Sequence, residues 1–106
     1  MTDTAKFADI ILPAASFLEF DDITFSYFNY YIGAQSKVSD PMGNSLPNTE
    51  IFRRLAKEMG IKKASLYESD QSLIDNMLRQ MKLDISFKDL KQKGFIYLEN
   101  KTIIPY

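Results

Sequence analysis

Three carboxylates, Glu19, Asp21 and Asp22, precede the most aromatic stretch of this chain. Carboxylate oxygens are the ligands that hard cations such as Ca²⁺ and Mg²⁺ prefer. The spacing does not match an EF-hand loop, however, and no glycine turns the chain between these residues. A solvated acidic loop is the simpler interpretation, and a cation site is the alternative.

Cysteine and histidine are both missing from the sequence. Without cysteine, the chain can form no disulfide and can supply no thiolate to zinc or to an iron–sulfur cluster. Without histidine, it lacks the side chain that most often serves as a general base near neutral pH and as a metal ligand. We therefore expect neither catalytic residues nor metal ligands within the chain.

Length and composition indicate one folded domain. The chain has 106 residues, of which 45% are hydrophobic and 25% are charged. The net charge of −1 indicates no excess of positive charge that would attract nucleic acid or an anionic membrane surface, so we expect neither as a partner. No apolar stretch approaches the roughly 18 residues that span a bilayer. Because the start of the chain is also a poor signal peptide, we expect a cytoplasmic protein.

An apolar run from Phe7 to Leu12 follows a short polar turn and ends at Pro13. A run of this kind is typical of a strand that is covered on both faces. Nothing before it could supply neighbouring strands, so the chain looks like a piece of a larger α/β protein. We expect the edges of this strand to be covered by the C-terminal hairpin, by the aromatic segment or by another copy of the chain.

Aromatic side chains then crowd the segment from Phe20 to Ile32. Aromatic and β-branched residues favour extended structure, so this segment is predicted to be strand-like or irregular and to end near Gly33. Prolines, a glycine and an asparagine punctuate residues 37–47, which we predict to be a loop.

The first predicted helix has Asn48 as its N-cap and Gly60 as its C-terminal stop. Glu50 lies in its first turn, where a negative charge stabilises the positive end of the helix. An apolar stripe at helical spacing predicts one buried face. The stripe consists of Ile51, Phe52, Leu55, Ala56 and Met59.

Two further helices are predicted in the second half of the chain. Ser69 or Asp70 caps one of them, and the other spans Asp84 to Gly94 with a cap formed by Ser86 and Asp89. The apolar stripe of the first of these two helices consists of Leu73, Ile74, Met77, Leu78 and Met81.

The chain ends in two short apolar segments, Phe95–Leu98 and Thr102–Ile104, which flank a polar turn and suggest a hairpin. The predicted fold is therefore α/β, or α+β for the chain in isolation, with about three helices packed on a small sheet.

Three segments carry a family resemblance. They are Thr2-Asp-Thr-Ala-Lys-Phe-Ala-Asp-Ile-Ile-Leu-Pro13 with the following Phe17-Leu-Glu-Phe-Asp-Asp22, then Glu50-Ile-Phe-Arg-Arg-Leu-Ala-Lys-Glu-Met-Gly60, and finally Ser86-Phe-Lys-Asp-Leu-Lys-Gln-Lys-Gly-Phe95. In these segments and in their order, the chain resembles the molybdopterin-dependent oxidoreductases. That family includes formate dehydrogenases, nitrate reductases and dimethyl sulfoxide reductase, and the formate-dehydrogenase-like branch is the most similar.

The resemblance implies a catalytic subunit whose domains surround two molybdopterin guanine dinucleotides with one molybdenum or tungsten ion. The chain is similar to the end of the third, Rossmann-like domain, so residues 1–106 would be a single domain or domain fragment. In the parent protein the chain would complete the domain that forms one wall of the cofactor-binding cleft, and the cofactor would supply the redox chemistry. Because the metal ligand and the iron–sulfur region lie upstream in the family, we expect the isolated chain to be inactive and to bind no cofactor.

The resemblance also suggests four cofactor-binding residues: Thr4, Glu19, Asn29 and Gln35. Thr4 flanks the predicted first strand, and ligands of open α/β sheets bind beyond the carboxyl ends of strands. The alternative is that Thr2 to Thr4 only cap a helical turn. Glu19 stands where the family usually has a glutamate, and Asn29 could donate a hydrogen bond to the pterin.

The segment around Asn29 departs from the family pattern. Relatives often have Gly-His or Asn-x-x-Arg here, followed by Gln or Arg, whereas this chain has Phe28-Asn29 and Gly33-Ala34. These departures leave open whether cofactor binding persists. The aromatics of this segment could belong to the core or could form an exposed patch where other domains dock.

Two kinds of partner follow from these expectations. The remaining domains or subunits of the oxidoreductase are one, and a second copy of the chain, joined through the exposed strand or the aromatics, is the other. The rival function is a free-standing interaction or structural module without catalysis, or a degenerate relic of the family.

Overall fold

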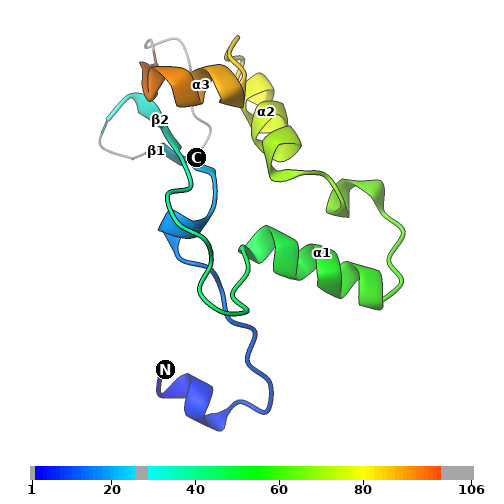
Figure 1. Cartoon of the computed structure of the whole chain (residues 1–106). Coiled ribbons are helices and arrows are strands. Elements are labelled where there is room, and N and C mark those ends of the chain that lie inside the picture. Colours follow the sequence, from blue (N-terminus) through cyan, green and yellow to red (C-terminus); the bar gives the residue numbers. More distant parts are fainter. Residues whose placement is uncertain (1, 26–28, 99–106) are drawn as a thin grey trace.

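The computed structural model describes residues 2–25 and 29–98 (Figure 1). Three strands form one antiparallel sheet in the order β1-β2-β3, with β1 at Asp22–Phe25, β2 at Tyr31–Gln35 and β3 at Phe95–Tyr97. The aromatic segment, which was predicted to be strand-like or irregular and to end near Gly33, thus supplies β1 and the start of β2, which continues to Gln35. The second arm of the predicted C-terminal hairpin, Thr102–Ile104, lies outside the described residues.

Strand register divides the sheet into an apolar inner face and an aromatic outer face. Ile23 pairs with Ala34, and Ile32 pairs with Ile96, so these four side chains share the inner face. On the outer face Tyr31 is opposite Tyr97, and the ring of Tyr31 makes edge-to-face contacts with Phe95 and Tyr97.

Two helices, α2 (Asp70–Gln80) and α3 (Phe87–Lys93), pack against the inner face. Both begin at the predicted serine caps: the Ser69 side chain accepts a hydrogen bond from the Ser72 N–H, and the Ser86 side chain accepts one from the Asp89 N–H. α3 ends at Gly94, whose φ of 81° suits glycine. The core that results consists of Ile23, Ile32, Ile74, Leu78, Phe87, Leu90 and Leu98.

The first helix, α1 (Asn48–Glu58), lies apart from this core (Figure 1). Of its predicted apolar stripe only Ala56 is buried, while Phe52 and Met59 remain 64% and 66% exposed. The prediction of Asn48 as N-cap is wrong, because Asn48 is the first helical residue and no side chain caps the helix at Pro47. Gly60 follows the helix with a φ of 67°, which agrees with its predicted role.

The predicted buried strand from Phe7 to Leu12 is wrong in this structure. Thr4–Phe7 forms a 3-10 helix, the following residues form no strand, and Phe7 and Ile10 are 89% and 80% exposed. Figure 1 shows this N-terminal arm, residues 2–12, projecting away from the sheet. None of the expected covers lies over the arm within the described residues. An apolar run can form a buried strand only where neighbouring strands supply hydrogen bonds and covering surface, and the arm has neither here.

The described residues thus form three α-helices and a three-stranded antiparallel sheet, an α+β arrangement. Within residues 2–25 and 29–98, no helix has the length and apolar character needed to cross a bilayer.

Candidate functional site

A pair of chain segments, residues 13–21 and 36–47, runs from the sheet toward the N-terminal arm and is joined by backbone hydrogen bonds. We call this pair the strap. The Ala15 N–H donates to the Leu46 carbonyl over 2.8 Å, and the Leu46 N–H donates to the Pro13 carbonyl over 3.1 Å. Nearer the sheet, the Val38 N–H donates to the Leu18 carbonyl over 2.9 Å. The strap contains no residue of the buried core, so these polar bonds define its shape.

Two of the predicted cofactor-binding residues hold the strap together. One Glu19 carboxylate oxygen accepts the Ser16 N–H over 2.6 Å, and the other accepts the Met42 N–H over 3.0 Å. The Gln35 side-chain amide donates to the Phe17 carbonyl. Glu19 and Gln35 therefore lie close together, and both are bonded to backbone groups of this chain.

Asp21 connects the strap to α3. Its carboxylate accepts the Lys37 N–H over 2.8 Å and the Lys91 ammonium over 2.7 Å. These two bonds, that from Lys91 first, hold the pKa of Asp21 below its ordinary value although partial burial acts in the opposite direction.

The acidic residues that suggested a cation site do not form one in the described part of the chain. Glu19 and Asp21 are bonded to N–H groups and a lysine, and Asp22 accepts its neighbour's N–H, from Ile23, over 2.8 Å. Across residues 2–25 and 29–98, no group of three or more carboxylate, histidine or cysteine side chains is placed to hold a metal ion.

Asn29 lies at the far end of the hairpin from Glu19 and Gln35, because it is two residues before the start of β2. Its side-chain oxygen accepts the Tyr31 N–H over 3.1 Å, which shapes the turn into the strand. Asn29 also borders a shallow groove of about 230 Å³ on the outer face of the sheet. Thr24, Phe25 and Gly33 are among the groove's lining residues, and Tyr31 and Phe95 contribute aromatic side chains from the outer face.

Thr4 is exposed in the 3-10 helix of the N-terminal arm. Its neighbour Thr2 accepts the Ala5 N–H over 3.3 Å, which agrees with the capping alternative. The structure therefore brings Glu19 and Gln35 together but leaves Asn29 and Thr4 at separate places.

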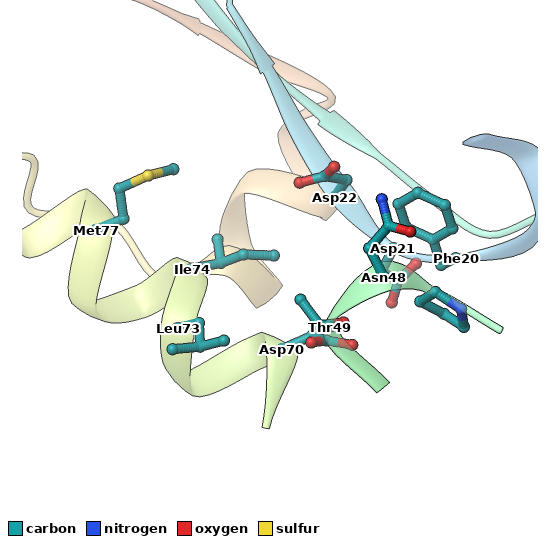
Figure 2. Close-up of a pocket in the computed structure, with 10 residues that line it drawn as sticks. Phe20, Asp21, Asp22, Asn48, Thr49, Asp70, Leu73, Ile74 and Met77 are labelled. Atoms are coloured by element: carbon teal, nitrogen blue, oxygen red, sulfur yellow. The ribbon is translucent and has the colours of Figure 1, made fainter. Parts of the chain in front are cut away.

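A cleft that the sequence did not reveal lies between the start of β1, the start of α1 and one side of α2 (Figure 2). Its volume is about 270 Å³. The apolar stripe of α2 gave the only sequence signal, because it is wide enough to cover the core and still present Leu73 and Met77 to this space. The lining residues are Phe20, Asp21, Asp22, Pro47, Asn48, Thr49, Asp70, Leu73, Ile74 and Met77.

Comparison with known proteins settles the family. The model of the family described as molybdopterin oxidoreductase matches residues 1–58, more than half of the chain. The chain belongs to the molybdopterin oxidoreductase family. Proteins of this family bind a molybdopterin cofactor.

Curated relatives in this family include two from Bacillus subtilis. "Probable oxidoreductase YoaE" is 45% identical over 78 residues, which are 74% of this chain and 12% of the relative. "Probable oxidoreductase YyaE" is 30% identical over 104 residues, which are 97% of this chain and 16% of the relative. The "F420-dependent formate dehydrogenase 2 subunit alpha" of Methanococcus maripaludis is 37% identical over 79 residues, 74% of this chain and 12% of the relative. The chain thus spans only a small part of each of these molybdopterin oxidoreductase relatives.

Proposed function

We propose that this chain acts as part of a molybdopterin oxidoreductase catalytic subunit. There it completes a Rossmann-like domain that forms one wall of the cofactor-binding cleft. The observation that carries the proposal is the exposure of the N-terminal arm. Phe7, Ile10 and Leu12 are at least 60% exposed, and they lie within the segment that the family model matches. Such an apolar run is unfavourable in water and would become buried if further strands were placed beside it.

The residues of this chain fit the wall of such a site and not its metal centre. The chain has no cysteine and no histidine, and among the described residues no carboxylate cluster is placed to hold a metal. The groove beside Asn29 offers aromatic rings and polar groups, which suit contact with a flat, hydrogen-bonding ring system. When bound, the cofactor would supply the redox chemistry.

Within this proposal the four predicted residues have different roles. Asn29 would contact the cofactor from the groove, and Thr4 would do so only after the arm joins a larger sheet. Glu19 and Gln35 would act on the cofactor site indirectly, since their polar groups already bind the backbone of the strap. Formate is the substrate that we propose, because relatives named formate dehydrogenase are among those that match.

The second candidate is a free-standing interaction or structural module without catalysis. The self-contained core favours it, because the sheet, α2 and α3 bury seven large apolar side chains without help from any other chain. A module with its own core could fold alone and use the uncovered arm to bind a partner.

The two candidates can be separated on the protein as the organism makes it. We expect the natively purified protein to contain molybdenum or tungsten by mass spectrometry and to release a fluorescent pterin after oxidation. Finding neither metal nor pterin would reject the first candidate and leave the structural module.

A matched pair of variants tests the arm itself in that protein. Ile10→Asp should lower the pterin content severalfold, because a charge would then have to be buried in the completed sheet. Val38→Asp, at a side chain that is also more than 70% exposed but lies in the strap, should leave the pterin content unchanged. Equal pterin content in both variants would show that the arm stays exposed in the assembled enzyme.

A further inference from the structure

In the cleft between β1, α1 and α2, one wall belongs to α2 and is apolar apart from Asp70 at the start of that helix (Figure 2). Asp21 and Asp22 lie on the other side of the cleft, together with Phe20. Ile74 is 7% exposed and belongs to the core, whereas Leu73 and Met77 on the same helix are 38% and 36% exposed and border the cleft. The stripe of α2 is therefore wider than the core that it covers, and Leu73 and Met77 leave apolar surface open in the cleft. Methionine is well suited to such a wall because its flexible side chain adapts to different partners.

Three carboxylates line the cleft and differ in their partners: Asp21 and Asp22 lie opposite the apolar side chains of α2, and Asp70 is the first residue of α2. Asp21 is paired with Lys91 over 2.7 Å, and Asp70 is paired with Arg53 over 2.5 Å. Asp22 forms no ion pair with any lysine or arginine of the described residues, and none of the residues lining the cleft is basic. One negative charge in the cleft is thus uncompensated by the described part of the chain.

The third feature of the cleft is the strand beside it. Asp22 is the first residue of β1, and β1 is an end strand of the described sheet. An end strand can accept hydrogen bonds from an added extended segment, the mode of recognition known as β-strand addition. The cleft therefore favours a guest that is extended, apolar on the side of α2 and positively charged opposite Asp22.

We infer that this cleft binds an extended polypeptide segment from outside these 106 residues, one that presents a single Lys or Arg side chain flanked by aliphatic side chains. The basic group pairs with Asp22, and the aliphatic groups cover Leu73 and Met77. The inference rests on the proposed function in one respect, namely that the remainder of the oxidoreductase supplies the segment. An unrelated polypeptide with the same chemistry would also fit, so the test measures the cleft directly and needs no cofactor.

The test is an NMR titration of the 106-residue chain, labelled with ¹⁵N, with the acetylated and amidated tripeptide Leu-Arg-Leu. We expect saturable amide shifts at Asp22, Leu73 and Met77, and we expect Leu-Gln-Leu to bind about fivefold more weakly because it lacks the charge. Asp22→Asn should weaken the binding of Leu-Arg-Leu by a similar factor. Asp9→Asn, which removes an exposed carboxylate outside the cleft, should leave that binding unchanged.

A second substitution addresses the apolar wall. Met77→Gln keeps the length of the side chain and should weaken both tripeptides, while circular dichroism checks that the helices persist. Equal binding of Leu-Arg-Leu and Leu-Gln-Leu, or equal effects of Asp22→Asn and Asp9→Asn, would overturn the inference. So would the absence of shifts at the cleft. The presence of metal and pterin in the natural protein is measured separately, so failure of the cleft and failure of the proposed function are distinguishable.

Discussion

Two regions of the molecule contain similar apolar stripes but differ in what covers them. In the first region, which we call the packed module, the sheet, α2 and α3 bury one another. The core residues Ile32, Leu78 and Leu90 of this module are completely inaccessible to solvent. In the second region, which consists of the N-terminal arm and α1, a comparable supply of large apolar side chains stays exposed and only Ala56 is buried.

The difference teaches that two segments within the family match, the arm and α1, depend most on partners. The match covers residues 1–58, which include the arm, α1, and the strands β1 and β2 of the packed module. α2, α3 and β3 lie beyond it and provide most of the core. The packed module therefore buries its own apolar core, whereas the apolar side chains of the arm and of α1 are covered only if another surface packs against them. Four predictions can break or sharpen this comparison.

The largest effect is expected from truncating one leucine in each region. Leu78→Ala in α2 should lower the free energy of unfolding by about 3 to 5 kcal/mol, because it leaves a cavity in a fully buried site. Leu55→Ala in α1 should lower it by less than about 1 kcal/mol, because that side chain is 44% exposed. Urea denaturation measures both. Similar losses of unfolding free energy in the two variants would show that Leu55 is buried in solution and would contradict the difference between the two regions.

A medium effect is expected at the contact that holds α1 to the rest of the chain. Arg53 donates to the Glu68 carbonyl over 2.8 Å and to the Asp70 carboxylate, which joins α1 to the start of α2. Arg53→Ala should cost about 1 to 2 kcal/mol. In hydrogen exchange it should reduce the protection of α1 while α2 keeps its protection.

The neighbouring arginine provides the control. Arg54 is 64% exposed and pairs only with Glu50 one turn away in the described structure, so Arg54→Ala should cost less than about 0.5 kcal/mol. If Arg53→Ala changed the protection of α1 and α2 equally, the two regions would unfold as one unit.

A smaller effect distinguishes the helix caps. Ser86→Ala removes the side chain that accepts the Asp89 N–H at the start of α3, and it should cost about 1 kcal/mol. Asn48→Ala should cost only about a few tenths of a kcal/mol, because Asn48 is inside α1 and does not cap it. Thermal unfolding followed by circular dichroism measures the two variants. If Asn48→Ala lowered the stability as much as Ser86→Ala does, Asn48 would act as the N-cap of α1 in solution.

The smallest effect concerns the ion pair that joins the strap to the packed module. The pKa of Asp21 is lowered in the folded chain, first by the hydrogen bond from Lys91. Its contribution to stability is therefore complete above the ordinary pKa of an aspartate and is lost as the pH falls from that value toward the lowered one. Because the pair is about one-third exposed, solvent screens it, and we expect a contribution of about 0.5 kcal/mol.

Asp21→Asn should remove the contribution of the Asp21 carboxylate to the pH dependence of the free energy of unfolding, as measured by urea denaturation between neutral pH and pH 3. Lys91→Met should lessen the same contribution, because the backbone bond from Lys37 remains. The double variant should then resemble Asp21→Asn alone. Additive effects of the two substitutions would mean that these side chains do not interact in solution.

Local signals explain which elements could be predicted from the sequence. The second and third helices were located correctly because each has a serine cap, an apolar stripe and, in α3, a terminal glycine, all of which act within a few residues. The cap of α1 was misplaced by one residue because Asn48 has a suitable side chain but lies one position inside the helix. Family membership was equally accessible, since short segments in a conserved order carried it.

Features that depend on distant segments could not be predicted. The apolar arm was expected to be a buried strand, but periodicity cannot say whether a neighbouring strand exists. The bonds of Glu19 to Met42 and of Gln35 to Phe17 join residues 23 and 18 positions apart, so local spacing could not reveal them, and the role of both residues at a cofactor stays a prediction. The cleft beside Asp22 arises from three elements that meet only in the folded chain.

The sequence by itself therefore determined the family of this protein, the positions of its helices and the aromatic segment that becomes two strands. These properties follow from side-chain type, spacing and local hydrogen bonding. Only the tertiary structure decided which apolar stripes are covered and which carboxylates bind backbone, lysine or neither. Burial and pairing depend on surfaces that distant residues supply, and within the described chain the arm has no such surface and α1 buries only Ala56.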